Sequence, residues 1–211
     1  MGEATEELQR TVEALGTYSI LLGSDPSLPS VASVIVGEPV GRVWGHPQGE
    51  AIWRASEELA HHPKVLVTKL VSGKVTYVHQ RLWPAVLAVA RASEPWQVGS
   101  LSRAARSLLE AVTRNGEVRT DQVPRMPGVK APSPGDAARE LERRLLVHSQ
   151  EVHTSTGAHA KYLETWDRWA NRVGFRAKEL TVERAKETIE EVLAGLNRQF
   201  GARGRLPWNA A

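Results

Sequence analysis

The sequence predicts an α+β protein made of tandem winged helix-turn-helix modules with an added C-terminal helix. Residues 100–170 follow the order helix, turn, basic helix and two alternating strands, and residues 50–91 follow the order helix, hairpin, helix. A further periodic helix follows Thr181. We expect three parts: an N-terminal helical, winged-helix-like domain over 1–95, a winged helix-turn-helix domain over 96–175, and a C-terminal helix and tail over 176–211.

The N-terminal part begins with an amphipathic helix over residues 5–15. Thr5 can cap this helix, apolar side chains recur at helical spacing, and Gly16 is expected to end it. The apolar run 31–36 is expected to be buried, and its type, strand or short helix, stays open. The segment 37–49 is expected to be irregular because it is rich in glycine and proline.

Residues 50–91 predict a helix, a β-hairpin and a second helix. Helical apolar spacing covers 50–61 and stops before a proline. Two β-rich runs flank the dipeptide Ser72-Gly73, which favours a tight turn, so we expect a hairpin over 65–79. A helix over 81–91 follows.

The second module is expected to begin with an amphipathic helix that Ser100 caps and Gly116 ends. A short strand over 117–119 and a brief helix over 120–123 follow, which together form the helix-turn-helix step. Prolines and glycines then make 124–135 a loop.

A basic helix beginning near Asp136 is the first candidate binding element. Its residues Arg139, Arg143 and Arg144 lie off the apolar face, and arginine suits bidentate contacts with phosphate or guanine. These three are candidate DNA-binding residues. Because acidic residues interleave with them, a merely solvated helix face is the alternative.

The apolar and polar residues alternate from Leu146, which predicts a strand, a turn and a second strand through Glu164. This hairpin would be the wing, and it carries two more candidate DNA-binding residues, His159 and Lys161. A helix is the alternative over 158–166. A helix over 166–172 is expected next, with its two tryptophans in the core rather than stacked on bases.

The 211-residue chain has a net charge of +3, and the positive excess lies between residues 96 and 180. This modest excess is the footprint expected if the segment contacts phosphates. The chain has no cysteine, which excludes disulfides, zinc-thiolate sites and cysteine nucleophiles. No apolar run approaches the roughly 20 residues that span a bilayer, and no signal-peptide pattern begins the chain, so we expect a cytoplasmic protein with no membrane partner.

Two phrases carry a resemblance to a known family. TKLVSGKVTYVHQRLWP over 68–84 and LLVHSQEVHTSTGAHAKYLETWDRW over 145–169 resemble the winged-helix DNA glycosylase superfamily, which includes bacterial crosslink-repair enzymes. The resemblance implies tandem winged helices that grip a duplex, with excision of damaged bases in the catalytic members. Those members carry a glutamine-apolar-glutamine motif. Every glutamine here is isolated, so the chain is expected to be a member without that motif, and the catalytic residues are unknown.

The densest cluster of candidate metal ligands is His148, His153 and His159, with Glu151 among them. In a hairpin, His148 and His153 have opposite parity and would point to opposite faces. We therefore expect no metal site, and no phosphate loop or dinucleotide fingerprint indicates a cofactor.

The first hypothesis is a winged-helix protein that binds double-stranded DNA, non-catalytic or of unassigned activity. One alternative is a DNA-repair glycosylase that acts on damaged bases. The other is a winged-helix module that binds a protein partner, in which case the arginines are only solvated. The helix after Thr181 is expected to pack within the chain, and pairing with its copy in a homodimer is the alternative.

Overall fold

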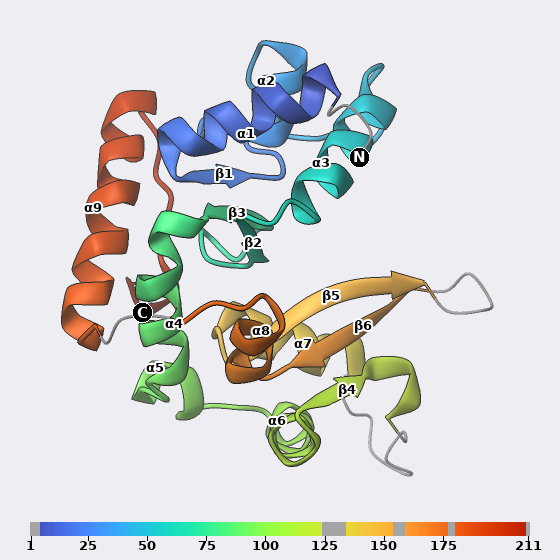
Figure 1. Cartoon of the computed structure of the whole chain (residues 1–211), viewed down its shortest axis with the longest axis vertical. Coiled ribbons are helices and arrows are strands. Elements are labelled where there is room, and N and C mark those ends of the chain that lie inside the picture. Colours follow the sequence, from blue (N-terminus) through green and yellow to red (C-terminus); the bar gives the residue numbers. More distant parts are fainter. Residues whose placement is uncertain (1–4, 124–133, 154–158, 177–179, 210–211) are drawn as a thin grey trace. The chain divides into compact units, whose positions relative to one another are not determined.

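The computed structural model describes residues 5–123, 134–153, 159–176 and 180–209 (Figure 1). Helices make up 55% and strands 15%, which is compatible with the predicted α+β class. The chain divides into two compact units, one formed by 1–86 with 179–211 and the other by 87–178. We call them unit 1 and unit 2.

Unit 1 packs three helices against a three-stranded antiparallel sheet of order β1-β3-β2. Its elements, together with the helix α4 in which the chain leaves the unit, are α1 (Glu6–Tyr18), β1 (Ile20–Leu22), α2 (Val31–Val36), α3 (Gly49–Ala60), β2 (Val65–Thr68), β3 (Thr76–His79), the 3-10 helix η1 (Gln80–Leu82), α4 (Trp83–Arg91), α9 (Val182–Phe200) and the 3-10 helix η3 (Pro207–Asn209).

Helix α1 begins where the sequence predicts and ends later. The Thr5 side chain accepts a hydrogen bond from the Leu8 amide at 3.2 Å, which confirms the predicted cap. The helix continues through Gly16, so the predicted end was wrong. Ser19, at φ 66°, closes it by donating its amide to the Leu15 carbonyl, and the chain turns directly into β1.

The predicted hairpin is present, but its loop is longer than the tight turn that the dipeptide Ser72-Gly73 alone would form. Strand pairing stops at Thr68 and Thr76. The tight turn still forms at the expected place, because Ser72 and Gly73 both have positive φ and the Lys74 amide donates to the Val71 carbonyl at 3.0 Å.

The run 31–36 is a helix, which decides between the two types that its sequence left open. The Ser30 side chain and Ser33 form a reciprocal capping box at its start. Helices α1, α2 and α3 share one apolar core with the sheet; its fully buried members include Leu15, Leu21, Val31, Ile52 and Leu59.

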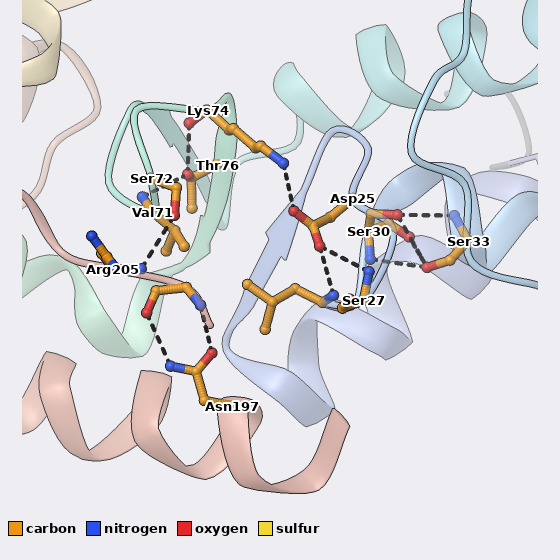
Figure 2. A network of polar contacts seen from close by, with 12 residues as sticks. Asp25, Ser27, Ser30, Ser33, Val71, Ser72, Lys74, Thr76, Asn197 and Arg205 are labelled. Atoms are coloured by element: carbon orange, nitrogen blue, oxygen red, sulfur yellow. Dashed lines mark hydrogen bonds and ion pairs between the residues drawn. The ribbon is translucent and has the colours of Figure 1, made fainter. Parts of the chain in front are cut away.

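The C-terminal segment completes unit 1. The apolar stripe of α9 is buried within the chain, which confirms the predicted packing role. After the helix, Asn197 bonds both the amide and the carbonyl of Gly204, and the Ser72 amide donates to the Arg205 carbonyl at 2.7 Å (Figure 2). A Cβ at Gly204 would lie 2.8 Å from a methyl group of Leu28, so a larger residue here would force the neighbouring side chains to shift.

Unit 2 also contains a three-stranded antiparallel sheet, of order β4-β6-β5. Helices α6 and α7 pack together over one face of it and share its apolar core. The elements of unit 2 are α5 (Pro95–Val98), α6 (Arg103–Asn115), β4 (Glu117–Arg119), the 3-10 helix η2 (Thr120–Gln122), α7 (Pro134–Arg143), β5 (His148–His153), β6 (His159–Glu164) and α8 (Trp166–Arg172).

Two predicted helix starts in unit 2 were wrong. Ser102 caps α6, since its side chain accepts from the Ala105 amide at 3.1 Å, whereas the Ser100 hydroxyl accepts from Arg144. Helix α7 begins at Pro134, so Asp136 lies in its first turn. Most of the predicted loop 124–135 and the predicted wing turn after His153 lie outside the described residues.

The strand interpretation of residues 158–164 is confirmed over the described β6, which pairs with both β4 and β5. Helix α8 follows with the predicted bounds. Both units therefore share one order: a helix, a strand, a short helical segment, a helix and a hairpin. In both, the first strand pairs with the last strand of the hairpin.

Candidate nucleic-acid interface

Helix α7 exposes two arginines and one acidic residue, Asp136, and buries another acidic residue. Arg139 and Arg143 are exposed, while Glu142 is buried at 4% exposure beside Leu141. Arg139 is ion-paired with Asp136 at 3.0 Å. Within the part of the chain that the structure describes, the Arg143 guanidinium has no hydrogen-bond or ion-pair partner. The outer face of α7 therefore carries a net positive charge.

Glu142 and Lys161 form an ion pair between α7 and the hairpin. The Lys161 Nζ atom lies 2.6 Å from each carboxylate oxygen of Glu142, and the Ser149 hydroxyl also donates to this carboxylate. Thr120 accepts from the Lys161 amide at 2.9 Å. The ion pair fixes β5 and β6 against α7. It also occupies the ammonium group of Lys161, which the sequence predicted as a DNA contact.

Arg144 joins the end of α7 to the segment around α5. Its guanidinium donates to the Trp96 carbonyl at 2.7 Å, to the Gln97 carbonyl at 3.2 Å and to the Ser100 hydroxyl at 2.8 Å. The Arg144 carbonyl accepts from the Gln97 side chain at 3.1 Å. These bonds occupy this guanidinium inside unit 2.

Of the five nominated residues, the structure therefore places two, Arg139 and Arg143, on one open surface. Lys161 lies beneath α7 and Arg144 at its end. His159 pairs in register with His153 at the end of the hairpin, and its side chain lies outside the described residues.

Helix α6 adds cationic side chains that the sequence did not nominate. Arg103, Arg106 and Arg114 are exposed on this helix, which packs directly against α7. Arg106 and Arg114 lie three and eleven residues after Arg103, outside the apolar stripe, and this helical spacing is the signal that could have identified them.

The opposite face of the unit 2 sheet holds a buried polar cluster beneath α8. The His148 Nδ1 atom lies 3.0 Å from a carboxylate oxygen of Glu164, and the Arg172 guanidinium donates to the same carboxylate at 2.5 Å and 3.3 Å. Glu164 is fully buried. Trp166 and Trp169 pack their rings against His148 with centroid separations of 5.7 Å.

Burial lowers the pKa of His148 below its ordinary value, and the Arg172 charge acts in the same direction, against the neighbouring carboxylates. Burial alone would raise the pKa of Glu164, but the bonds from His148 and Arg172 lower it below its usual range. At neutral pH the cluster therefore contains a neutral His148 imidazole beside the ionised Glu164 carboxylate, and the Arg172 guanidinium balances the charge of that carboxylate.

The two tryptophans of α8 are 4% and 3% exposed, and the Trp166 indole donates to the Leu145 carbonyl at 2.7 Å. This confirms the interpretation that they belong to the core. Among the described residues, no group of histidine and acidic side chains could hold a metal ion.

Unit 1 contains a polar network at the end of β1 (Figure 2). The Asp25 carboxylate accepts from the amides of Ser27 and Leu28 at 2.9 Å and 2.8 Å, and from the Lys74 ammonium at 2.7 Å. Burial raises the pKa of Asp25, but these donors lower it more, so the net shift is downward. The network fixes the turn between β1 and α2 against the hairpin loop.

A family model described as AlkZ related matches residues 3–202. The chain belongs to the AlkZ-related family. AlkZ is a DNA crosslink-repair glycosylase, so this membership supports the resemblance to crosslink-repair glycosylases that the phrases at 68–84 and 145–169 carry. Comparisons with curated proteins and with solved structures gave no match. Within the described residues of this AlkZ-related chain, no helix is long and apolar enough to cross a membrane.

Proposed function

We propose that the chain is a winged-helix protein that binds double-stranded DNA through the outer face of α7 in unit 2. The order of elements supports a winged helix in each unit. A helix, a strand, a short helical segment, a second long helix and a hairpin follow one another, with the first strand paired to the last strand of the hairpin. In this arrangement α7 takes the place of the recognition helix.

The observation that carries the proposal is the separation of charge on α7. Glu142 points inward to Lys161, and Glu140 accepts from the Ser102 amide at 2.9 Å, whereas the exposed Asp136 pairs with Arg139 at 3.0 Å. Arg143 can therefore meet phosphate or guanine directly, and Arg139 can do so by exchanging its exposed ion pair, because such a pair contributes little free energy. This observation favours a nucleic-acid surface over a merely solvated helix face.

We assign different tasks to the other nominated residues. Lys161 and Arg144 would have to give up several bonds to reach a phosphate. Lys161 instead positions the hairpin against α7, and Arg144 fixes the end of the helix. His159, at the end of the hairpin, stays a proposed wing contact.

The proposal is tested by fluorescence anisotropy with a labelled duplex over a salt series. We compare wild type with Arg139→Ala/Arg143→Ala and with a matched control, Arg10→Ala/Arg198→Ala, which removes two exposed arginines of unit 1. The α7 variant should bind less tightly, and its log–log salt slope should be shallower by about two units, roughly 0.9 for each phosphate that is no longer neutralised. The control should follow wild type. Absence of wild-type binding at low salt would remove the DNA proposal.

A second candidate is damaged-base excision, and family membership is the observation that favours it. The chain lacks the glutamine-apolar-glutamine motif of the catalytic relatives, so a reaction would use other side chains. Incubation with alkylated duplex, followed by chromatographic detection of released base, decides between excision and binding alone.

A protein-interaction module is the remaining alternative. It is supported if wild type fails to bind duplex at low salt while the folded protein forms a stable complex with another chain. The apolar stripe of α9 is buried within unit 1, so it is not available for the homodimer that the sequence offered as an alternative. Sedimentation of the pure protein tests whether a homodimer forms through another surface.

A further inference from the structure

Trp44 is the most exposed large hydrophobic side chain among the described residues. Its exposed fraction is 85%, against 61% for Trp53 and 42% for Val75. Exposure of an indole to water is unfavourable, which makes this side chain a candidate contact for a partner.

A defined turn holds Trp44 in this position. The His46 amide donates to the Val43 carbonyl at 2.9 Å, and Gly45 has φ +80°, which is the geometry of a type II turn with Trp44 at its second position. Val43 packs against the core of unit 1. The His46 ring accepts from the Gln48 amide at 3.1 Å. The turn is anchored on both sides, so it presents the indole at a corner.

The charge around this turn suits an anionic partner. Arg42 is exposed, and the structure gives it no hydrogen bond or ion pair with any described residue. Between Glu38 and Glu50 the sequence contains no acidic residue. An exposed aromatic ring two residues away from an exposed guanidinium is a combination suited to nucleic acid, because the ring can stack on a base while the cation contacts phosphate.

Trp53 provides the contrast. It lies on α3 with Glu50 three residues before it and Glu57 four residues after it, and both acidic residues are exposed on the same side of the helix. Phosphates would be repelled there, so exposure of an indole does not by itself make a nucleic-acid contact.

We propose that Trp44 stacks on a DNA base that has lost its stacking neighbour, as beside an abasic position in a duplex, while Arg42 contacts the adjacent phosphate. This inference rests on the proposed function and adds a structural preference to it. Entry of an indole into an intact stack costs a few kcal/mol for unstacking, and a gap in the stack removes that cost.

The test uses two labelled duplexes of the same sequence, one intact and one with a tetrahydrofuran abasic analogue beside 2-aminopurine. Wild type should bind the abasic duplex more tightly and quench the 2-aminopurine fluorescence. Trp44→Ala should lose about tenfold in affinity for the abasic duplex together with the quenching, and should bind the intact duplex like wild type. Trp53→Ala, the matched control, should behave like wild type on both duplexes.

The outcomes separate the two proposals. If Trp44→Ala keeps the wild-type preference and quenching, the stacking inference is wrong and the DNA-binding proposal stands. If wild type binds neither duplex at low salt, both are wrong. Trp44→Phe, which keeps an aromatic ring, should retain part of the preference, and circular dichroism checks that each variant is folded.

Discussion

Helices α3 and α7 occupy the same place in the order of their units, yet they present different surfaces. Helix α7 exposes Arg139, Arg143 and Asp136, which pairs with Arg139, and it buries another acidic residue, Glu142. Helix α3 exposes arginine, tryptophan and acidic side chains together. A shared order of elements therefore does not give the two helices the same surface chemistry, and the proposed DNA contact of unit 1 lies on the turn before α3 instead.

The two sheets differ in a related way. In unit 2, Glu142, His148 and Glu164 are buried in or beside the sheet, and each has a polar or charged partner. In unit 1, Asp25 is the one buried ionisable side chain among the described residues, apart from the phenol of Tyr77. The stability of unit 2 should therefore depend more on charge than that of unit 1.

The largest effect is expected from Glu164→Ala. This change leaves His148 and Arg172 without the carboxylate that both bind. Loss of the acceptor of a buried hydrogen-bond donor, here the His148 imidazole, typically costs about 1–3 kcal/mol in the free energy of unfolding, whereas the Arg172 side chain is 45% exposed and can be hydrated. Urea denaturation followed by tryptophan fluorescence measures it. Glu164→Gln, which keeps one acceptor oxygen, should cost less, and a loss below about 1 kcal/mol for the alanine variant would mean that the cluster does not stabilise unit 2.

Acidification should destabilise unit 2 next. Because the pKa of His148 is lowered in the fold, the unfolded chain binds more protons than the folded one once the pH falls below about 6.5. The free energy of unfolding should then decrease as the pH falls, by at most about 1.4 kcal/mol per pH unit for one group. Glu164, whose pKa is also lowered, adds a loss in the same direction below about pH 4.3.

Urea denaturation at pH 7.5 and pH 5.5 checks this dependence, with near-ultraviolet circular dichroism reporting the tryptophans around His148. His148→Gln should flatten the profile between these values. An equally steep profile in that variant would assign the dependence to other groups.

A direct comparison of α3 and α7 is the third prediction. Arg143→Ala should weaken duplex binding by roughly tenfold at about 0.1 M salt if this guanidinium neutralises one phosphate. Arg54→Ala, an exposed arginine on α3, should leave binding unchanged. Anisotropy titrations at matched salt measure both, and equal losses would show that the two helices do not differ in their partner.

The smallest effect is expected at the helix caps, where the loss in free energy of unfolding should be similar in the two units. Ser30 caps α2 of unit 1 and Ser102 caps α6 of unit 2, each accepting a backbone amide. Each change to alanine should cost about 1 kcal/mol in the free energy of unfolding, measured by urea denaturation. A cost several times larger in one unit would indicate that its cap does more than satisfy one amide.

Local patterns predicted several elements well. Helix α8 has the predicted bounds because the alternation stops at Glu164 and the next residue, Thr165, caps the helix. The strand β1 escaped prediction, since three consecutive buried residues have no alternation. It is a strand because Ile20 pairs with Val78, a partner far along the chain. Such pairing cannot be read from a short run.

The candidate site was only half predictable for the same reason. Helical spacing correctly separated the arginines of α7 from its apolar stripe. It could not show that Arg144 bonds Trp96 and Ser100, more than forty residues earlier, or that Glu142 reaches Lys161 on the hairpin. Charge along a sequence indicates which side chains are polar, and only tertiary contacts decide which are already occupied.

Unit 1 is built from two separated stretches of chain, whereas unit 2 is one continuous stretch. During synthesis on the ribosome, unit 2 can complete its contacts before α9 has been made. Unit 1 begins first and must wait, because the bond between Ser72 and Arg205 and the place of Gly204 need the last part of the chain. A nascent chain cut before α9 should therefore present a complete second unit and a first unit that still lacks its C-terminal contacts, so the unit whose synthesis begins first is completed last.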